Sequence, residues 1–289
     1  MEDPWTIRRL LEWTARHFTG KGLDSPRLDA ELLLAHALEC PRIILYTRVD
    51  EEPAEAQRTR FRDLVKQRLE GRPVAHLLGR KEFFSYEFEV SPAVLIPRPD
   101  SEWLVTHALE LLKPLESPRV LDLGTGSGCL AISLALRHRG AQITAVDLSP
   151  AALEVARRNA ERHKVTDRIH FLEGDLFAPL DPTEQFDLLL SNPPYIRHAD
   201  LASLEADVRD YEPHLALDGG DDGFAVIDRI LAGAPARLTA QGSLVFEIGH
   251  DQETAGQERF ARVGGWEPVR TIHDAAGHPR VLSARRVPA

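Results

Sequence analysis

Beyond residue 118, apolar strand-like segments alternate with helical ones, and this alternation constrains the fold more than any other feature of the chain. Seven segments have strand composition: 119–123, 142–147, 168–175, 186–192, 243–249, 266–274 and 280–286. Helical patterns fill three of the intervals between them: 129–138, 150–163 and 223–238. Such alternation favours right-handed crossovers. The nearly continuous apolar run at 186–190 is typical of a strand buried on both faces. The sequence therefore predicts an α/β fold with a doubly wound, mostly parallel, seven-stranded sheet and a ligand at the carboxyl ends of its strands.

The first 80 residues carry helical patterns only. One helical face collects Ile7, Leu10, Leu11, Thr14 and Phe18, and a later face collects Phe61, Leu64, Val65 and Leu69. Between them, Ser25 and Pro26 are the start signal of a helix over 25–38. Residues 81–97 are aromatic and β-branched, which predicts a β-hairpin. A helix follows with Asp100 or Ser101 as its cap. We therefore expect a small all-helical domain at 1–80, a hairpin linker at 81–98 and the α/β domain at 99–289.

A glycine-rich loop lies directly between the first strand and the first helix of the alternating region. It contains Asp122, Gly124, Thr125, Gly126, Ser127 and Gly128. Glycines adopt positive φ and let the backbone approach a ligand closely. The dinucleotide fingerprint needs glycine or alanine where Cys129 stands, which disfavours an NAD oxidoreductase. The Asp122 carboxylate would repel a pyrophosphate and attract a cation, so the loop indicates a cationic nucleoside such as S-adenosylmethionine.

Two further carboxylates end the next two strands. Asp147 is placed to accept hydrogen bonds from two ribose hydroxyls. Its alternative role is to cap the helix that begins near Ser149. Asp175 is expected near the adenine edge, with Leu176 lining the base pocket, although aspartates at strand ends are also common turn formers.

The second chemical motif follows the strand at 186–192 and consists of Asn192, Pro193, Pro194 and Tyr195. The prolines stiffen the backbone and leave carbonyl oxygens without competing N–H groups. The Asn192 side chain and the Pro193 carbonyl can together accept from a planar NH₂ group, and Tyr195 offers a flat face. Next to a cofactor loop, this clamp predicts methyl transfer to a planar nitrogen. His198 is expected to be a loop residue only.

These motifs resemble those of the bacterial peptide chain release factor glutamine methyltransferases, a family of class I S-adenosylmethionine-dependent enzymes. The similarity runs through nearly the whole chain: SPRLDAELLLAHAL, VLDLGTGSGCLAI, AVDLSPAAL, SNPPYI, EPHLALDGGDDG, FEIGHDQ and DAAGHPRVL. The linker pattern PRPETE reads PRPDSE here, at 97–102. The resemblance implies methylation of the glutamine side-chain amide in the Gly-Gly-Gln motif of a release factor, with S-adenosylhomocysteine as product. The helical domain at 1–80 is expected to serve packing or partner recognition, and our hypothesis is that this transient protein substrate docks on it and on the hairpin linker.

The charge balance of the chain distinguishes between nucleic-acid and protein substrates. The net charge is −10, and beyond residue 79 there are 22 basic and 32 acidic side chains. Nucleic-acid binding depends on Lys and Arg, so an enzyme that flips adenine or cytosine into its pocket is disfavoured. Methylation of a ribosomal protein glutamine stays an alternative. A cofactor-binding protein without activity is less consistent with the amide clamp.

The remaining composition sets further expectations. Cys40 and Cys129 supply neither a disulfide framework nor a zinc site, so we expect no metal. We find no signal peptide or spanning segment and expect a cytoplasmic enzyme without a membrane partner. Glu247, at the end of a later strand, is expected behind the site.

Overall fold

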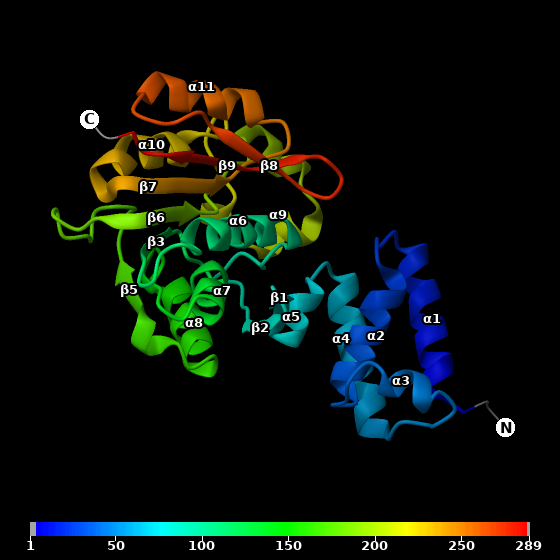
Figure 1. Cartoon of the computed structure of the whole chain (residues 1–289). Helices are drawn as coiled ribbons and strands as arrows, with labels where there is room; N and C mark the ends of the chain where they lie inside the picture. The colour runs from blue at the N-terminus through cyan, green and yellow to red at the C-terminus, as the bar shows by residue number, and fades with distance from the viewer. Residues whose placement is uncertain (1–3, 288–289) are drawn as a thin grey trace. The chain divides into compact units, whose positions relative to one another are not determined.

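The computed structural model describes residues 4–287. Contacts divide the chain into two compact units. The first contains the chain up to Gly79 together with Ala206–Tyr211, and the second contains Arg80–Glu205 and the chain from Glu212 onwards. Figure 1 shows the elements of both units. Within 4–287, no helix is both long and apolar enough to cross a membrane.

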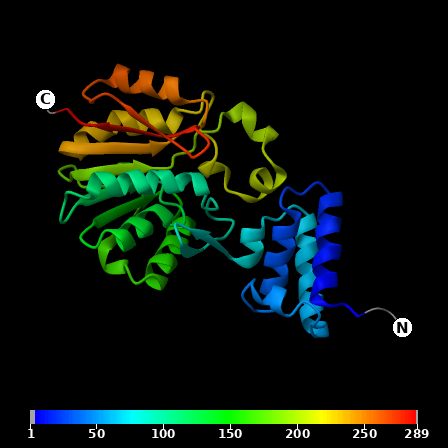
Figure 2. The ribbon, with the colours of Figure 1, turned by 45° about the vertical axis from the view of Figure 1, so that its right-hand side comes forward.

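The first unit is all-helical, as the sequence predicts. Its helices are α1 (Ile7–Gly20), α2 (Pro26–Ala37), α3 (Ile44–Thr47), α4 (Glu55–Leu69), α5 (Val74–Leu78) and α9 (Ala206–Tyr211). Helices α1, α2 and α4 pack side by side around one core (Figure 2). The predicted stripe is confirmed, because the buried side chains of α1 are Ile7, Leu10, Leu11, Thr14 and Phe18. The short helix α9 joins this unit through the Tyr211 hydroxyl, which donates to the Glu70 carbonyl at 2.8 Å.

The second unit opens with the expected hairpin, which is shorter than predicted. Strands β1 (Arg80–Phe83) and β2 (Tyr86–Glu89) pair in antiparallel fashion. The two residues of their turn, Phe84 and Ser85, both have positive φ, at 52° and 65°. This is the backbone that matches the twist of a two-residue hairpin loop. Residues 90–98 form no strand, since prolines recur there and cannot donate ladder hydrogen bonds.

A seven-stranded sheet forms the centre of the second unit. Its strands are β3 (Arg119–Leu123), β4 (Gln142–Asp147), β5 (Ile169–Glu173), β6 (Phe186–Ser191), β7 (Leu238–Glu247), β8 (Arg270–His273) and β9 (Pro279–Arg285). The spatial order is β5–β4–β3–β6–β7–β9–β8. The first five pair in parallel, whereas β9 runs antiparallel to both of its neighbours. The predicted α/β class and the seven expected strands are confirmed.

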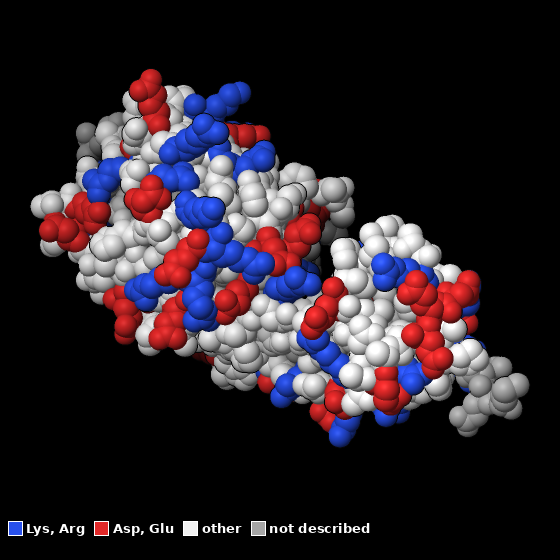
Figure 3. All heavy atoms as spheres, turned by 90° about the horizontal axis from the view of Figure 1, so that it is seen from below, with Lys and Arg blue, Asp and Glu red and all other residues white. Residues whose placement is uncertain are grey.

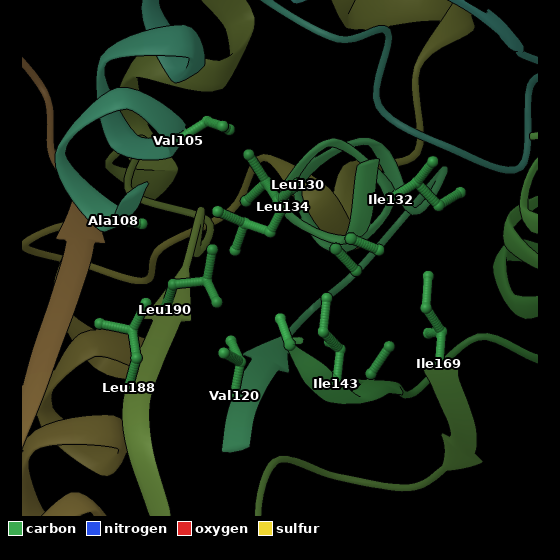
Figure 4. Packing of buried hydrophobic residues seen from close by; sticks show 14 of the residues in the cluster. Val105, Ala108, Val120, Leu130, Ile132, Leu134, Ile143, Ile169, Leu188 and Leu190 are labelled. Atoms are coloured by element: carbon green, nitrogen blue, oxygen red, sulfur yellow. The ribbon is translucent and has the colours of Figure 1, made fainter. Parts of the chain in front are cut away.

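Helices cover both faces of this sheet. The first layer contains α6 (Glu102–Leu112), α7 (Cys129–Arg137) and α8 (Pro150–Arg162). The second contains α10 (Ala225–Arg237) and α11 (Glu253–Val263), the latter not expected from the sequence. In β6, Leu188 and Leu190 pack into the first layer (Figure 4), whereas Leu189 packs into the second. The strand is therefore buried on both faces, as its apolar run predicts.

Candidate active site

The two chemical motifs follow neighbouring strands of the sheet. Strands β3 and β6 are parallel, with Leu123 opposite Ser191. The glycine loop after β3 and Asn192 after β6 therefore leave the same edge. The chain order reverses between these two strands, and doubly wound sheets open their binding crevice at such a point. A cavity lies here, entirely within the second unit.

Three glycines shape the wall of this cavity on the β3 side. Gly124, Gly126 and Gly128 have φ values of 72°, 56° and 78°, a region that favours glycine. A Cβ at Gly124 or Gly126 would meet no atom within 4 Å, so the backbone there is open to a ligand. A Cβ at Gly128 would lie 3.0 Å from the Ile132 side chain and 3.2 Å from Ala156. The third glycine therefore serves helix packing.

The Asp147 carboxylate lines the same cavity and organises the loop. Its Oδ2 accepts from the Gly126 N–H at 2.8 Å, and its Oδ1 accepts from the Ser149 N–H at 2.9 Å. Burial raises the pKa of this carboxyl. The cap of α8 is instead Ser149, whose side chain accepts from the Ala152 N–H. Each carboxylate oxygen keeps a second lone pair for a ligand hydroxyl.

Asp122 lies behind the glycine loop and is completely buried. Thr125 donates its hydroxyl to Oδ2 at 2.6 Å, whereas Oδ1 has no hydrogen-bond partner among the described residues. Burial raises the pKa of Asp122 to about 7. Asp122 thus lies near the glycine loop but is not part of the cavity wall.

The segment after β5 forms another wall of the cavity, where both predicted residues are found. The Asp175 carboxylate is exposed and pairs with Arg229 at 2.7 Å. Leu176 has a φ of 52°, a left-handed conformation that costs a non-glycine residue about 1–2 kcal/mol. Such strain is often retained beside binding sites.

The proline motif contributes Asn192 and Pro194 to the cavity wall, whereas Pro193 and Tyr195 are not among the lining residues. Asn192 Nδ2 donates to Ser101 Oγ at 3.0 Å. The Ser101 hydroxyl donates to Glu247 Oε2 at 2.6 Å, and the Tyr195 hydroxyl donates to Glu247 Oε1 at 3.1 Å. Ser101 is the N-cap residue of α6, as expected, but its hydroxyl makes no capping hydrogen bond because it turns inward to Glu247.

Two later segments hold the proline motif from behind, one before α11 and one before α10. The side-chain amide of Gln252 donates to the Tyr195 carbonyl at 2.9 Å. A Cβ at Gly219 would lie 2.8 Å from the Pro194 carbonyl, so only glycine permits this close approach. His198 lies outside the cavity lining and pairs with Asp218, which raises the His198 pKa.

The linker closes the crevice on its remaining side. Arg98 lines the cavity and pairs with the buried Glu212. Glu212 also accepts from the Ile96 N–H at 2.9 Å, so one carboxylate fixes both backbone and side chain of the linker. In the described part of the chain, no group of three or more metal-ligating side chains is placed to hold an ion.

Comparison with known proteins agrees with this geometry. Residues 9–79 match the family model of the PrmC N-terminal domain, and residues 101–210 match that of the methyltransferase small domain. A release factor glutamine methyltransferase of Rhodopirellula baltica is 45% identical, covering 99% of this chain and 98% of the relative. A release factor glutamine methyltransferase of Geobacter sulfurreducens is 41% identical, and the alignment covers 97% of this chain and 97% of the relative.

The chain belongs to the release factor glutamine methyltransferase family.

A solved structure supports the fold of this family member independently. The structure of a methyltransferase from Pyrococcus furiosus aligns with 72% of this chain and with 92% of its own chain. The TM-score is 0.52 and the sequence identity is 20%. At such low identity the likeness concerns the fold alone. It agrees with the α/β architecture of the second unit.

Several residues that shape the site of this methyltransferase are not identified by sequence reasoning. Ser101, Glu212 and Gln252 act through contacts with segments distant in the sequence. The one available signal was their position inside short motifs, such as FEIGHDQ at 246–252. No local pattern states which side chain each of them contacts.

Proposed function

We propose that this protein transfers a methyl group from S-adenosylmethionine to the glutamine side-chain amide in the Gly-Gly-Gln motif of a peptide chain release factor. Relatives with that name match nearly the full chain. The observation that carries the proposal is the Asn192 side chain, which is held at the wall of the cavity that the glycine loop also lines. We place this reaction in the cytoplasm, where translation terminates.

Four features of the site fit the proposed cofactor. Gly124 and Gly126 leave open space that a side chain would fill. Asp147 has lone pairs for ribose hydroxyls, and Leu176 offers an apolar contact for the base. Asp122, completely buried behind the loop, adds negative potential there in its ionised form, which favours a cationic ligand. When bound, S-adenosylmethionine supplies an electrophilic methyl group, and S-adenosylhomocysteine is the product.

The substrate nitrogen needs orientation more than it needs a base. An amide nitrogen is a poor nucleophile because its lone pair is delocalised into the carbonyl. Asn192 Oδ1 and the Pro193 carbonyl are proposed to accept its two N–H groups and to stabilise the positive charge that develops there. Such acceptors act most strongly where water is excluded. The proton then leaves to water.

Tyr195 and Pro194 complete the proposed substrate site. Because the Tyr195 hydroxyl is bonded to Glu247, the ring has a defined orientation. Pro194 restricts the backbone of the residue before it, which keeps the Pro193 carbonyl in place.

The charge distribution supports a protein substrate. On the face shown in Figure 3, basic and acidic side chains are interspersed. Many arginines are already paired with carboxylates, including Arg158 with Glu89 and Arg162 with Glu87. A nucleic-acid track requires cations that are available to phosphates. The charge balance and these pairs therefore both favour a protein substrate.

The helical domain is proposed to recognise the body of the release factor. The first unit carries a groove between α1 and α4 with an apolar floor that includes Leu10, Phe61 and Val65. Trp13 lines this groove and is 47% exposed. An exposed aromatic beside an apolar groove is typical of protein-binding surfaces.

Methyl labelling of purified substrates tests the function. The protein is incubated with labelled methyl donor and a purified release factor, the same factor with its Gly-Gly-Gln glutamine changed to alanine, ribosomal proteins, or single-stranded and duplex DNA. We expect label only in the unmodified release factor. Label in ribosomal protein would support the alternative glutamine substrate. Label in DNA, or equal label in the alanine variant, would refute the proposal.

A further inference from the structure

A buried series of hydrogen bonds connects the Asn192 amide to Glu247, the last residue of β7. It runs from Asn192 Nδ2 through the Ser101 hydroxyl to Glu247, with separations of 3.0 Å and 2.6 Å. Tyr195 donates to the other oxygen of the same carboxylate. Ser101 and Glu247 are 2% and 1% exposed, so water does not compete for these bonds.

The number of protons available determines which group donates and which accepts in each of these hydrogen bonds. An ionised carboxylate only accepts hydrogen bonds, and a hydroxyl has a single proton to donate. Ser101 gives its proton to Glu247 and can therefore only accept from Asn192. Asn192 must then present its NH₂ group to Ser101. Because the Asn192 side chain lines the cavity, its Oδ1 is left to face the ligand.

We propose that Ser101 and Glu247 are positioning residues that hold the Asn192 amide in the one orientation able to accept from the substrate nitrogen. The inference rests on the proposed function, in which Oδ1 is that acceptor. An amide turned by half a rotation would present N–H groups to the N–H groups of the substrate, and two donors repel each other. Neither Asn192 nor the proline motif alone prevents this rotation, because oxygen and nitrogen of the amide have nearly the same shape.

Protonation of Glu247 would remove the constraint. A protonated carboxyl can donate to Ser101, which frees the serine proton to bind Asn192 Oδ1 and turns the amide around. Burial raises the pKa of Glu247 to about 7, and the bonds from Ser101 and Tyr195 oppose that rise. The orienting effect is therefore strongest above neutral pH.

The other groups facing Glu247 come from three elements. Asp100 precedes α6 and raises the Glu247 pKa, whereas Arg280 on β9 lowers it. These two side chains pair with each other at 3.1 Å, and Arg280 also pairs with Asp274 at 2.9 Å. Burial keeps Cys129, at the start of α7, a neutral thiol by raising its pKa. Desolvation remains the dominant influence on Glu247.

Three serine variants separate positioning from mere packing. Ser101→Ala removes the relay, Ser101→Thr keeps its hydroxyl, and Ser133→Ala is the matched control. Ser133 is a buried serine of α7 outside the cavity lining, whose hydroxyl has no partner among the described residues. We expect Ser101→Ala to lower kcat on the release factor about 10- to 100-fold, with KM close to the parent value. Ser101→Thr should restore most of kcat, and Ser133→Ala should leave it unchanged.

The pH dependence provides a readout that simple packing would not change. Parent kcat should fall as pH drops through about 7, and the Ser101→Ala variant should lose this dependence. Equal pH profiles in the two proteins would overturn the proposal. So would a Ser101→Thr variant that folds like the parent but has the activity of Ser101→Ala.

A substrate-free measurement keeps this proposal distinct from the function itself. The side-chain NH₂ resonances of Asn192 are assigned by their loss in Asn192→Ala and followed by NMR over the same pH range. We expect a shift with a midpoint near 7 in the parent that is absent in Ser101→Ala. If the parent protein labels no release factor, the proposed function fails. The Asn192 resonances then decide by themselves whether Ser101 and Glu247 orient the amide. Identical resonances in parent and Ser101→Ala would refute the positioning role even in an active enzyme.

Discussion

Removing the Asp147 carboxylate should weaken cofactor binding more than it weakens the fold. In Asp147→Ala, the proposed ribose hydroxyls lose their acceptor, and the Gly126 N–H loses its bond of 2.8 Å. A hydrogen bond to a charged group contributes about 1–3 kcal/mol. At about 1.4 kcal/mol per tenfold change, the dissociation constant should rise about 5- to 140-fold.

Calorimetric titration with S-adenosylhomocysteine measures this effect without turnover. Glu173→Ala is the matched control, because Glu173 ends the neighbouring strand in register with Asp147, is exposed and does not line the cavity. We expect the control to bind like the parent. The Asp147→Ala variant should keep its circular dichroism spectrum. An Asp147→Ala variant that is folded and binds with parent affinity would refute the ribose assignment.

Three further predictions concern catalysis, packing and pH. Asn192→Ala should lower kcat about 10²- to 10³-fold, as loss of one charge-stabilising group does, while calorimetry shows a much smaller change in S-adenosylhomocysteine affinity. Gly128→Ala should lower the free energy of unfolding by about 1–2 kcal/mol or more in urea titrations, since its φ is 78° and its Cβ would crowd Ile132. Burial lowers the pKa of His107, so the unfolded chain binds more protons and stability falls as pH drops below about 6.5. His107→Gln should lose less thermal stability than the parent on acidification over that range.

Each of these predictions has a result that contradicts it. Parent-like turnover in Asn192→Ala would mean that the amide clamp is misassigned. An unchanged urea midpoint in Gly128→Ala would show that α7 and α8 adjust without cost. Parallel melting curves of the parent and His107→Gln from about pH 7.5 to about pH 5.5 would exclude a neutral buried His107.

Local periodicity was sufficient to predict the seven strands of the sheet and most of the long helices, but not every element of this fold. The stripe in α1 and the apolar run in β6 report burial directly, because a side chain's face follows from its position in the helix or strand. The helix α11 was missed because Gly256 and Phe260 are its only buried residues, and a single large apolar side chain gives no periodic signal. The sequence also could not predict that α9 belongs to the first unit, because this depends on long-range contacts such as that of Tyr211 with Glu70.

The sequence by itself determined which chemical groups the site contains. Gly124 stands directly after one predicted strand, and Asp147 and Asn192 are the last residues of two others. Parallel strands bring their carboxyl ends to one edge. Local rules therefore suffice for the glycine loop and the proline motif.

Only the tertiary structure decided how those groups are oriented. Ser101 and Glu247 are 146 residues apart and meet where the start of α6 packs against β7, which no local pattern encodes. Tertiary contacts also bury Asp122 behind the glycine loop and pair Asp175 with Arg229. Hydrogen-bond partners distant in sequence depend on the folded backbone as a whole, so the direction of the Asn192 amide is a property of the tertiary structure.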